Sequence, residues 1–219
     1  VPILTAAVLT AINMIYAAWR LPEPAKHHHV VPEEMVKMKV LSHRPILKMC
    51  SVYFVFTLAV TQLEAIFAFF MMHRFNYDAM HVAYVLALMA LIMIVIQGGL
   101  IRTLTQKYGE NVLLIAGAII LGLAFIFIPK SGTVTLLLLP LGLASIGRGI
   151  SQPSLMSLVS KKSPAHLRGT VMGTFQASAS LGRVVGPLIA GVLYDHWQAA
   201  PFYFAAVMMA VVFIISATL

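Results

Sequence analysis

Residues 111–128 read NVLLIAGAIILGLAFIFI, an apolar stretch without a charged side chain. The hydrocarbon core of a bilayer is ~30 Å thick, and a helix needs roughly 20 apolar residues to cross it. Similar runs recur along the chain, in which 60% of the residues are hydrophobic and only 10% are charged. A soluble domain carries about 25% charged residues. The composition therefore predicts a membrane protein.

The apolar runs predict an all-α fold, a polytopic bundle of membrane-spanning helices. Transmembrane β-strands would give segments of ~10 residues with alternating polarity, and the sequence contains no such pattern. Residues 1–19 are predicted to form one helix and residues 20–44 a polar linker, because several prolines interrupt the linker. Residues 45–219 are predicted to form a six-helix half. Its helices are expected at residues 45–72, 80–101, 111–128, 133–159, 167–194 and 200–219.

The distribution of basic residues predicts the orientation of these helices. Eleven of the fifteen Lys and Arg residues lie in the linker and its flank or at the connections after residues 101 and 159, and only Arg74 and Lys130 lie on the opposite side. By the positive-inside rule, the linker and the C-terminus are cytoplasmic, in an inner or plasma membrane. The net charge of +8 thus indicates membrane topology, and no nucleic-acid partner is predicted.

The same topology predicts what precedes this chain. Residues 1–19 would run from the outside to the cytoplasm, which makes them an even-numbered helix of a protein that begins in the cytoplasm. A long cytoplasmic linker and six closely connected helices then follow, as in the second half of a two-part bundle. The sequence opens at Val1 inside an apolar run, so we expect the N-terminal helices of the same protein upstream.

Three charged residues, Glu64, Arg148 and Arg183, fall inside predicted spans. A charge at a helix centre costs ~2.5–3.5 kcal/mol on insertion scales, so it normally faces a cavity or a partner. Each shares a helical face with uncharged polar residues. These are Thr57 and Thr61 for Glu64, with Gln62 alongside, Ser145 and Gln152 for Arg148, and Gln176 and Ser180 for Arg183. Polar stripes on three helices indicate a water-accessible path for a small-molecule substrate.

Glu64 is the candidate for proton coupling. A carboxyl group is harder to ionise in an apolar site than in water, so it can bind and release a proton as a cavity alternates between the two sides of the membrane. Arg148 would favour the ionised form when it lies nearby. A structural interpretation stays open, because a buried Glu–Arg pair can lock helices together. Arg183, beside glycines, could likewise satisfy backbone carbonyls at a kink.

Small residues mark the sixth predicted span as a packing helix. Gly182, Gly186 and Gly191 lie on it at spacings of four and five residues, and small residues at such spacing let helix backbones approach closely. Pro187 removes a helix hydrogen bond and favours a kink. We therefore expect close packing there, with a hinge as an additional role. Glycines and a proline around Arg148 predict a bent helix in the fifth span.

No pattern in the sequence indicates catalysis, a metal site or a cofactor. There is no Walker motif and no nucleophile–base constellation, so an enzyme is not predicted. His27, His28 and His29 resemble a metal-binding tract, but three adjacent histidines in a loop do not converge on one ion. Cys50 is the one cysteine of the chain, which excludes an internal disulfide.

Three segments carry a family resemblance. Residues 19–24 (WRLPEP) match a signature that follows a sixth helix, residues 98–110 (GGLIRTLTQKYGE) a loop motif, and residues 168–191, beginning RGTVMG and including Gly186-Pro187, an eleventh helix. In these segments the chain resembles the major facilitator superfamily, and within it the drug/proton antiporters similar to tetracycline exporters. Two departures leave the direction of transport open. The acidic residue of the first loop motif is absent here, and the antiporter glycine-proline signature belongs to a fifth helix outside this chain.

The resemblance implies a twelve-helix carrier in two pseudo-symmetric halves, with helices one, four, seven and ten lining the cavity. This chain would supply helices six to twelve. Glu64 would lie on helix seven and Arg148 on helix ten, both facing the central cavity. The resemblance also implies a cytoplasmic gate loop, formed by Gly99, Arg102, Lys107 and Gly109.

Three functions follow as hypotheses. The first is a secondary active transporter that couples the export of small amphiphilic organic compounds to protons by alternating access. The second is a uniporter or symporter of a specific anionic solute held by Arg148 and Arg183. The third is a non-transporting membrane scaffold, or a half-transporter that works as an assembly.

Overall fold

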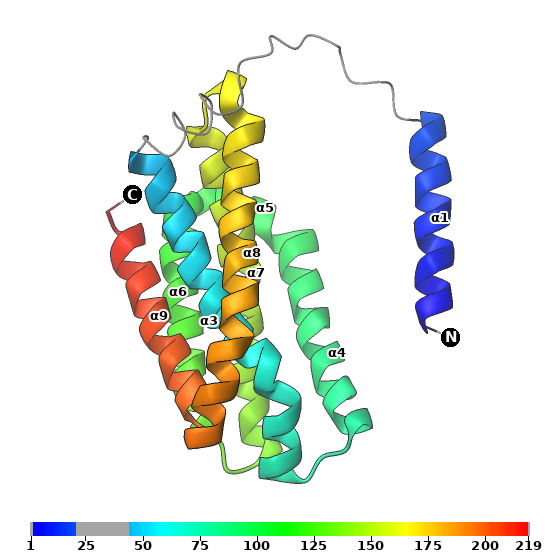
Figure 1. Ribbon diagram of the computed structural model, residues 1–219, viewed down its shortest axis with the longest axis vertical. Helices are drawn as coiled ribbons and strands as arrows, with labels where there is room; N and C mark the ends of the chain where they lie inside the picture. The colour runs from blue at the N-terminus through cyan, green and yellow to red at the C-terminus, as the bar shows by residue number, and fades with distance from the viewer. Residues whose placement is uncertain (1, 21–43, 219) are drawn as a thin grey trace. The chain divides into compact units, whose positions relative to one another are not determined.

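The computed structural model describes residues 2–20 and 44–218 (Figure 1). These described residues fall into two units, which are treated separately. The first contains helix α1 (Pro2–Arg20), which covers the first predicted span. The histidine tract and most of the predicted linker lie outside the described residues. Within residues 2–20 and 44–218 the secondary structure is helical without strands, as predicted.

Residues 44–218 form a bundle of long helices joined by short connections (Figure 1). The elements are α3 (Arg44–Phe75), α4 (Ala79–Val95), the π-helical turn η1 (Ile96–Leu100), α5 (Ile101–Tyr108), α6 (Glu110–Phe127), η2 (Ile128–Lys130), α7 (Val134–Lys162), η3 (Ala165–Leu167), α8 (Arg168–His196) and α9 (Ala200–Ser216). Among the described residues, six helices are long and apolar enough to cross a membrane. Helix α9 is also apolar but has 17 residues, the lower limit of the range for a spanning helix.

The bundle has a basic end and an opposite end. At the basic end α3 and α8 begin and α5 and α7 finish, with Arg44, Lys107, Lys161, Lys162 and Arg168. The opposite end contains the turn between α3 and α4. There Asp78 caps α4 by accepting a hydrogen bond from the backbone N–H of His81 at 2.9 Å. This hydrogen bond lowers the pKa of the Asp78 carboxyl group.

The core is built from two helix pairs, α3 with α8 and α6 with α7, and α9 packs against both α3 and α6. Tyr53 and Phe175 stack across the first pair with ring centroids 4.1 Å apart. In the second pair, a Cβ added to Gly147 would lie 2.9 Å from the carbonyl oxygen of Gly117. Lipid tails are as apolar as leucine, so association in a membrane depends on such close packing.

The structure differs from the expected layout after residue 101. A cytoplasmic loop was expected to hold Arg102 and Lys107, but the helix continues through η1 and α5 to Tyr108. The glycine pair Gly98-Gly99 is absorbed in the π-helical turn and does not end the helix. The chain turns only at Gly109, whose φ of +79° is a conformation that favours glycine. The proposed gate residues are therefore mainly helical.

Candidate functional site

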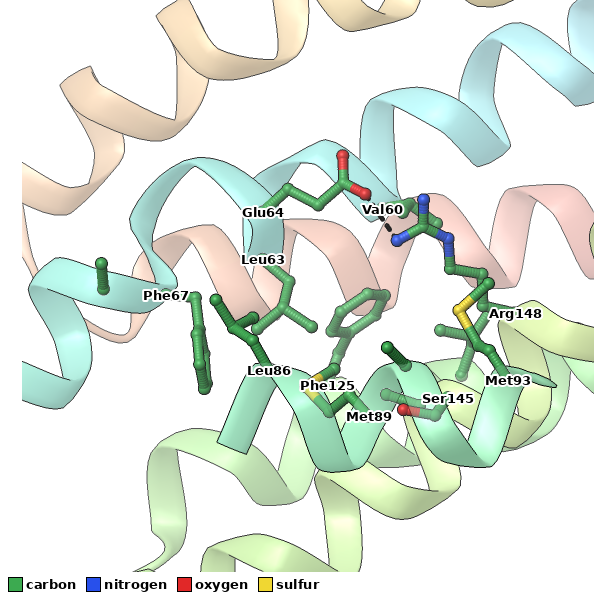
Figure 2. A pocket seen from close by; sticks show the side chains of 14 residues that line it. Val60, Leu63, Glu64, Phe67, Leu86, Met89, Met93, Phe125, Ser145 and Arg148 are labelled. Carbon is green, nitrogen blue, oxygen red and sulfur yellow. Dashed lines mark ion pairs between the residues drawn. The ribbon is translucent and has the colours of Figure 1, made fainter. Parts of the chain in front are cut away.

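Glu64 on α3 and Arg148 on α7 form an ion pair, with Oε1 of Glu64 2.5 Å from Nη1 of Arg148 (Figure 2). The side chains are 46% and 32% exposed, respectively. Two of the three charges that the sequence places inside spans are therefore brought together. Their partial exposure means that a ligand can reach the pair without unfolding either helix.

A cavity of about 280 Å³ opens beside this ion pair, between α3, α4, α6 and α7. Its polar lining consists of Glu64, Arg148 and Ser145, and the remaining lining is apolar (Figure 2). The apolar residues are Val60, Leu63, Phe67, Ala68, Leu86, Met89, Ala90, Met93, Leu121, Phe125 and Ala144. An apolar cavity with a few convergent polar groups is the usual form of a small-molecule site. The cavity therefore suits a mostly apolar ligand with a charged or polar group.

Small residues on both sides of Arg148 fix the backbone that carries it. Gly147 packs against α6, and a Cβ added to Gly149 would lie 3.0 Å from Cγ2 of Ile96, the first residue of η1. Both contacts need the absence of a side chain, because a Cβ this close would displace its neighbour. These glycines, from which a bend was expected, hold α7 close to α6 and η1 and so position the guanidinium.

A second, water-sized cavity of about 20 Å³ lies between α3, α7 and α8. It is lined by all three predicted intramembrane charges, Glu64, Arg148 and Arg183, and by Gln152. A cavity needs ~10–15 Å³ to hold one water molecule. The tertiary structure therefore gathers the charged residues of three helices around a space that suits water or one small polar group.

Thr57, Thr61 and Gln62 lie mainly at the contact between α3 and α8. All three are buried. A Cβ added to Gly182 would lie 3.1 Å from Cβ of Thr57, and one added to Gly186 would lie 2.9 Å from Cβ of Thr61. The two threonines also touch the small polar cavity, whereas Gln62 lies outside both linings.

Gln62 links the two helices with its amide group. Its Nε2 donates to the carbonyl oxygen of Gly186 at 3.0 Å and to that of Leu58 at 3.1 Å. The hydroxyl group of Thr61 donates to backbone carbonyls of its own helix. These polar groups, expected to face a cavity, thus satisfy backbone acceptors and hold α3 against α8.

The remaining predicted residues lie apart from the ion pair. Gln176 is exposed on α8 and belongs to neither lining. Pro187 and Gly191 line a third cavity of about 450 Å³ between α3 and α8, at the end opposite the basic end. The gate candidates Gly99, Arg102, Lys107 and Gly109 lie on η1, on α5 and at the turn that follows.

Two polar clusters were not predicted from the sequence. In the third cavity, Nδ1 of His73 lies 3.1 Å from the hydroxyl oxygen of Tyr194. At the basic end, the hydroxyl group of Ser157 donates to Oε1 of Glu110 at 2.9 Å, and Lys161 contacts the same oxygen. Each cluster joins two helices through residues that are ordinary at helix ends, so only the fold identifies them. Among the described residues, no group of histidine, cysteine and carboxylate side chains could hold a metal ion.

Comparisons with known proteins give one consistent family. The Major Facilitator Superfamily model matches residues 1–184 and 104–219 in two overlapping stretches. Multidrug resistance protein 2 of Bacillus subtilis (strain 168) is 30% identical over 73% of this chain and 40% of its own length. Tetracycline resistance protein, class B, of Escherichia coli is 28% identical over 60% of this chain and 32% of its own length. The chain thus spans well under half of these relatives.

A solved structure shows the same fold. The crystal structure of the human organic anion transporter MFSD10 (TETRAN) superposes with a TM-score of 0.74 at 27% identity. The match covers 78% of this chain and 40% of that transporter. The family-model match and the structural superposition both extend over most of this chain. The chain therefore belongs to the Major Facilitator Superfamily, as a multi-pass membrane protein with the architecture of one transporter half.

Proposed function

We propose that this chain forms part of a secondary active transporter that exports small amphiphilic organic compounds in exchange for protons. The proposal includes alternating access around a central site, and N-terminal helices of the same protein that complete it. The coverage of about two fifths of the length of Multidrug resistance protein 2 supports the second point. The names of relatives, which refer to resistance to multiple drugs and to tetracycline, support export of organic compounds.

The observation that carries the proposal is the Glu64–Arg148 pair at the edge of an apolar cavity. While Glu64 is ionised, the pair ties α3 to α7. Protonation of Glu64 removes its charge and leaves Arg148 without its partner, which weakens the connection between the two helices. A single protonation event can therefore change the contacts of two cavity-lining helices. Coupling of proton binding to movement needs such a difference between two states.

Transport driven by an imposed pH gradient tests this function. The full-length protein would be reconstituted in liposomes loaded with a fluorescent amphiphilic dye and a pH-sensitive reporter. The imposed gradient is expected to drive protons in one direction and the dye in the other. Dye movement is expected to stop when a protonophore collapses the gradient. Dye movement at the same rate with and without a gradient would contradict proton coupling.

A second candidate function is transport of an organic anion. Two guanidinium groups, those of Arg148 and Arg183, line the small polar cavity, and the solved relative is titled an organic anion transporter. For this function, Arg148→Ala is expected to abolish binding of an aromatic acid while leaving binding of a cationic dye unchanged. Equilibrium binding of both probes to the purified full-length protein measures the difference. Equal losses for both probes would count against an anion-specific role.

The orientation is part of the proposal: the basic end, with the gate candidates Arg102 and Lys107, faces the cytoplasm. We expect a cysteine at Gly132, at the opposite end, to react with a membrane-impermeant maleimide in intact cells. A cysteine at Gln106 on α5 is expected to react only after permeabilisation. Both positions are exposed, and each would be introduced into a cysteine-free version of the full-length protein. The reverse labelling pattern would overturn this orientation.

A further inference from the structure

We propose that the Glu64–Arg148 pair recognises an amphiphile that carries both a positive and a negative charge, and that the adjoining cavity holds the apolar body of this ligand. The inference rests on the proposed transport function and narrows its substrate class. Glu64 would bind the cationic group and Arg148 the anionic group. The argument depends on the charge balance of the site, on an unused donor of Arg148 and on the lining of the cavity.

The charge balance favours a ligand with two opposite charges. The ion pair is neutral as a unit and supplies the charged residues in the lining of the larger cavity, which is otherwise almost entirely apolar. Arg183 lines the small polar cavity but not this larger one. A purely cationic ligand that binds Glu64 competes with Arg148 and leaves that guanidinium without a carboxylate. A purely anionic ligand that takes Arg148 leaves Glu64 without a cationic partner in the lining of the larger cavity. An unpaired charge beside an apolar lining is unfavourable, by less at these partly exposed side chains than at fully buried ones, whereas a zwitterion supplies a partner for each side chain.

Hydrogen-bonding capacity points to the same ligand. Nε of Arg148 is buried and has no hydrogen-bond partner within the described residues. Arginine has five N–H donors, and an ion pair through Nη1 leaves others free to bind a carboxylate or phosphate oxygen. An anionic ligand group beside the guanidinium would accept from N–H groups of this partly exposed side chain, whereas the buried Nε would need a shift of the side chain to take part. The second carboxylate oxygen of Glu64 lies outside the contact with Arg148 in Figure 2 and can accept from an ammonium group.

The cavity supplies the apolar part of the recognition. Phe67 and Phe125 contribute aromatic surfaces, and Met89 and Met93 of α4 contribute flexible thioether side chains (Figure 2). Methionine adapts to irregular shapes and makes favourable contacts with aromatic rings. The volume of about 280 Å³ suits a compact ring system. The ligand would therefore place an aromatic or branched apolar body in the cavity and both charged groups at the ion pair.

Four probes with one naphthyl body separate the contributions of the charges. They are naphthylalanine, which is a zwitterion, naphthylethylamine, naphthylpropionate and the neutral naphthylpropanol. Binding to the purified full-length protein at neutral pH would be measured by calorimetry. The zwitterion is expected to bind at least about ten-fold more tightly than each of the other three, which corresponds to ~1.4 kcal/mol. An amine or an acid that binds as tightly as the zwitterion overturns the proposal, as does absence of binding by all four.

Charge variants then assign each ligand group to its side chain. Glu64→Gln is expected to bring the affinity of the acid up to that of the zwitterion, and Arg148→Gln to do the same for the amine. The double variant E64R/R148E retains a pair and is expected to recover the preference for the zwitterion that each single exchange loses. Unchanged binding of the neutral alcohol shows that a variant is folded. A zwitterion preference that persists in either glutamine variant contradicts the assignment.

A matched pair of alanine variants tests the role of the cavity. Ala90→Leu on α4 fills part of the cavity and is expected to weaken binding of all four probes at least about five-fold. Ala87→Leu, on the same helix but outside the lining, is expected to leave all four affinities unchanged. Equal effects of the two variants would contradict a ligand in this cavity. If proton-driven transport depends on Glu64 but no zwitterion preference is found, the proposed function stands and this inference fails.

Discussion

Glu64→Gln is expected to abolish proton-driven transport by the full-length protein while leaving the fold intact. Glutamine keeps the size of the side chain but cannot exchange a proton or form an ion pair with Arg148. The ion pair between α3 and α7 at 2.5 Å would become a hydrogen bond from the charged guanidinium to an uncharged amide oxygen, which does not change with pH. The rate of dye movement under a pH gradient is then expected to fall at least about ten-fold, to the rate seen without a gradient.

A matched control separates this effect from a general loss of one carboxylate. Asp78→Asn makes the same chemical change at the N-terminus of α4, where asparagine also caps a helix well. Asp78 lies outside both linings that contain Glu64, so wild-type proton dependence is expected. Proton-driven transport by the Glu64→Gln protein at the wild-type rate would remove Glu64 from the coupling mechanism.

Gly186→Val is expected to destabilise the bundle strongly, because there is no room for a side chain between α8 and α3. A Cβ at this position would lie 2.9 Å from Cβ of Thr61, would clash more severely with the Thr61 hydroxyl oxygen, and would lie 3.5 Å from the carbonyl oxygen of Leu58. Overpacking a core costs typically ~1–3 kcal/mol and occasionally more. The hydrogen bond from Gln62 to Gly186 would also be strained. Thermal unfolding of the purified full-length protein would show the loss as a lower melting temperature.

Gly191 offers the matched comparison on the same helix. A Cβ added there meets no atom within 4 Å, and replacing a helical glycine by alanine gains up to about 1 kcal/mol where the backbone permits it. Gly191→Ala is therefore expected to keep or raise the melting temperature, whereas Gly186→Ala lowers it. Adding Thr61→Ala to Gly186→Ala should recover part of the loss. Equal melting temperatures for the two single variants would show that α8 does not pack against α3 through Gly186.

The apolar runs determined the class of the protein without tertiary information. A helix satisfies its own backbone hydrogen bonds, and the bilayer sets its length, so length and hydropathy sufficed to predict the helices of residues 44–218. The positions at which helices end were harder to predict. The span predicted at residues 80–101 was expected to be followed by a loop, yet the helix continues through Gly98-Gly99 to Tyr108. Two glycines weaken a helix but do not stop it, and the π-helical turn accommodates them.

The sequence also identified the charged residues of the site. A charge inside an apolar span is costly, so it normally faces a cavity or a partner. What the sequence could not decide was which charges meet. Helical periodicity places Glu64 and Arg148 on faces of their own helices, but it does not place α3 relative to α7. Close approach through small residues sets the position of α7 against α6, as at Gly147 and Gly117, and that of α8 against α3, as at Gly186 and Thr61.

The relative positions of the helices also explain why some residues have surroundings that differ from those expected. Thr57 and Thr61 share a polar stripe with Glu64, Gln62 lies alongside, and this pattern alone indicates a cavity. Only the position of α8 shows that glycines cover most of this stripe and that Gln62 bonds to Gly186. The sequence by itself therefore determined the helices, their membrane environment and the charged candidates. The tertiary structure decided which of these side chains face a cavity, because that depends on contacts between helices far apart in the chain.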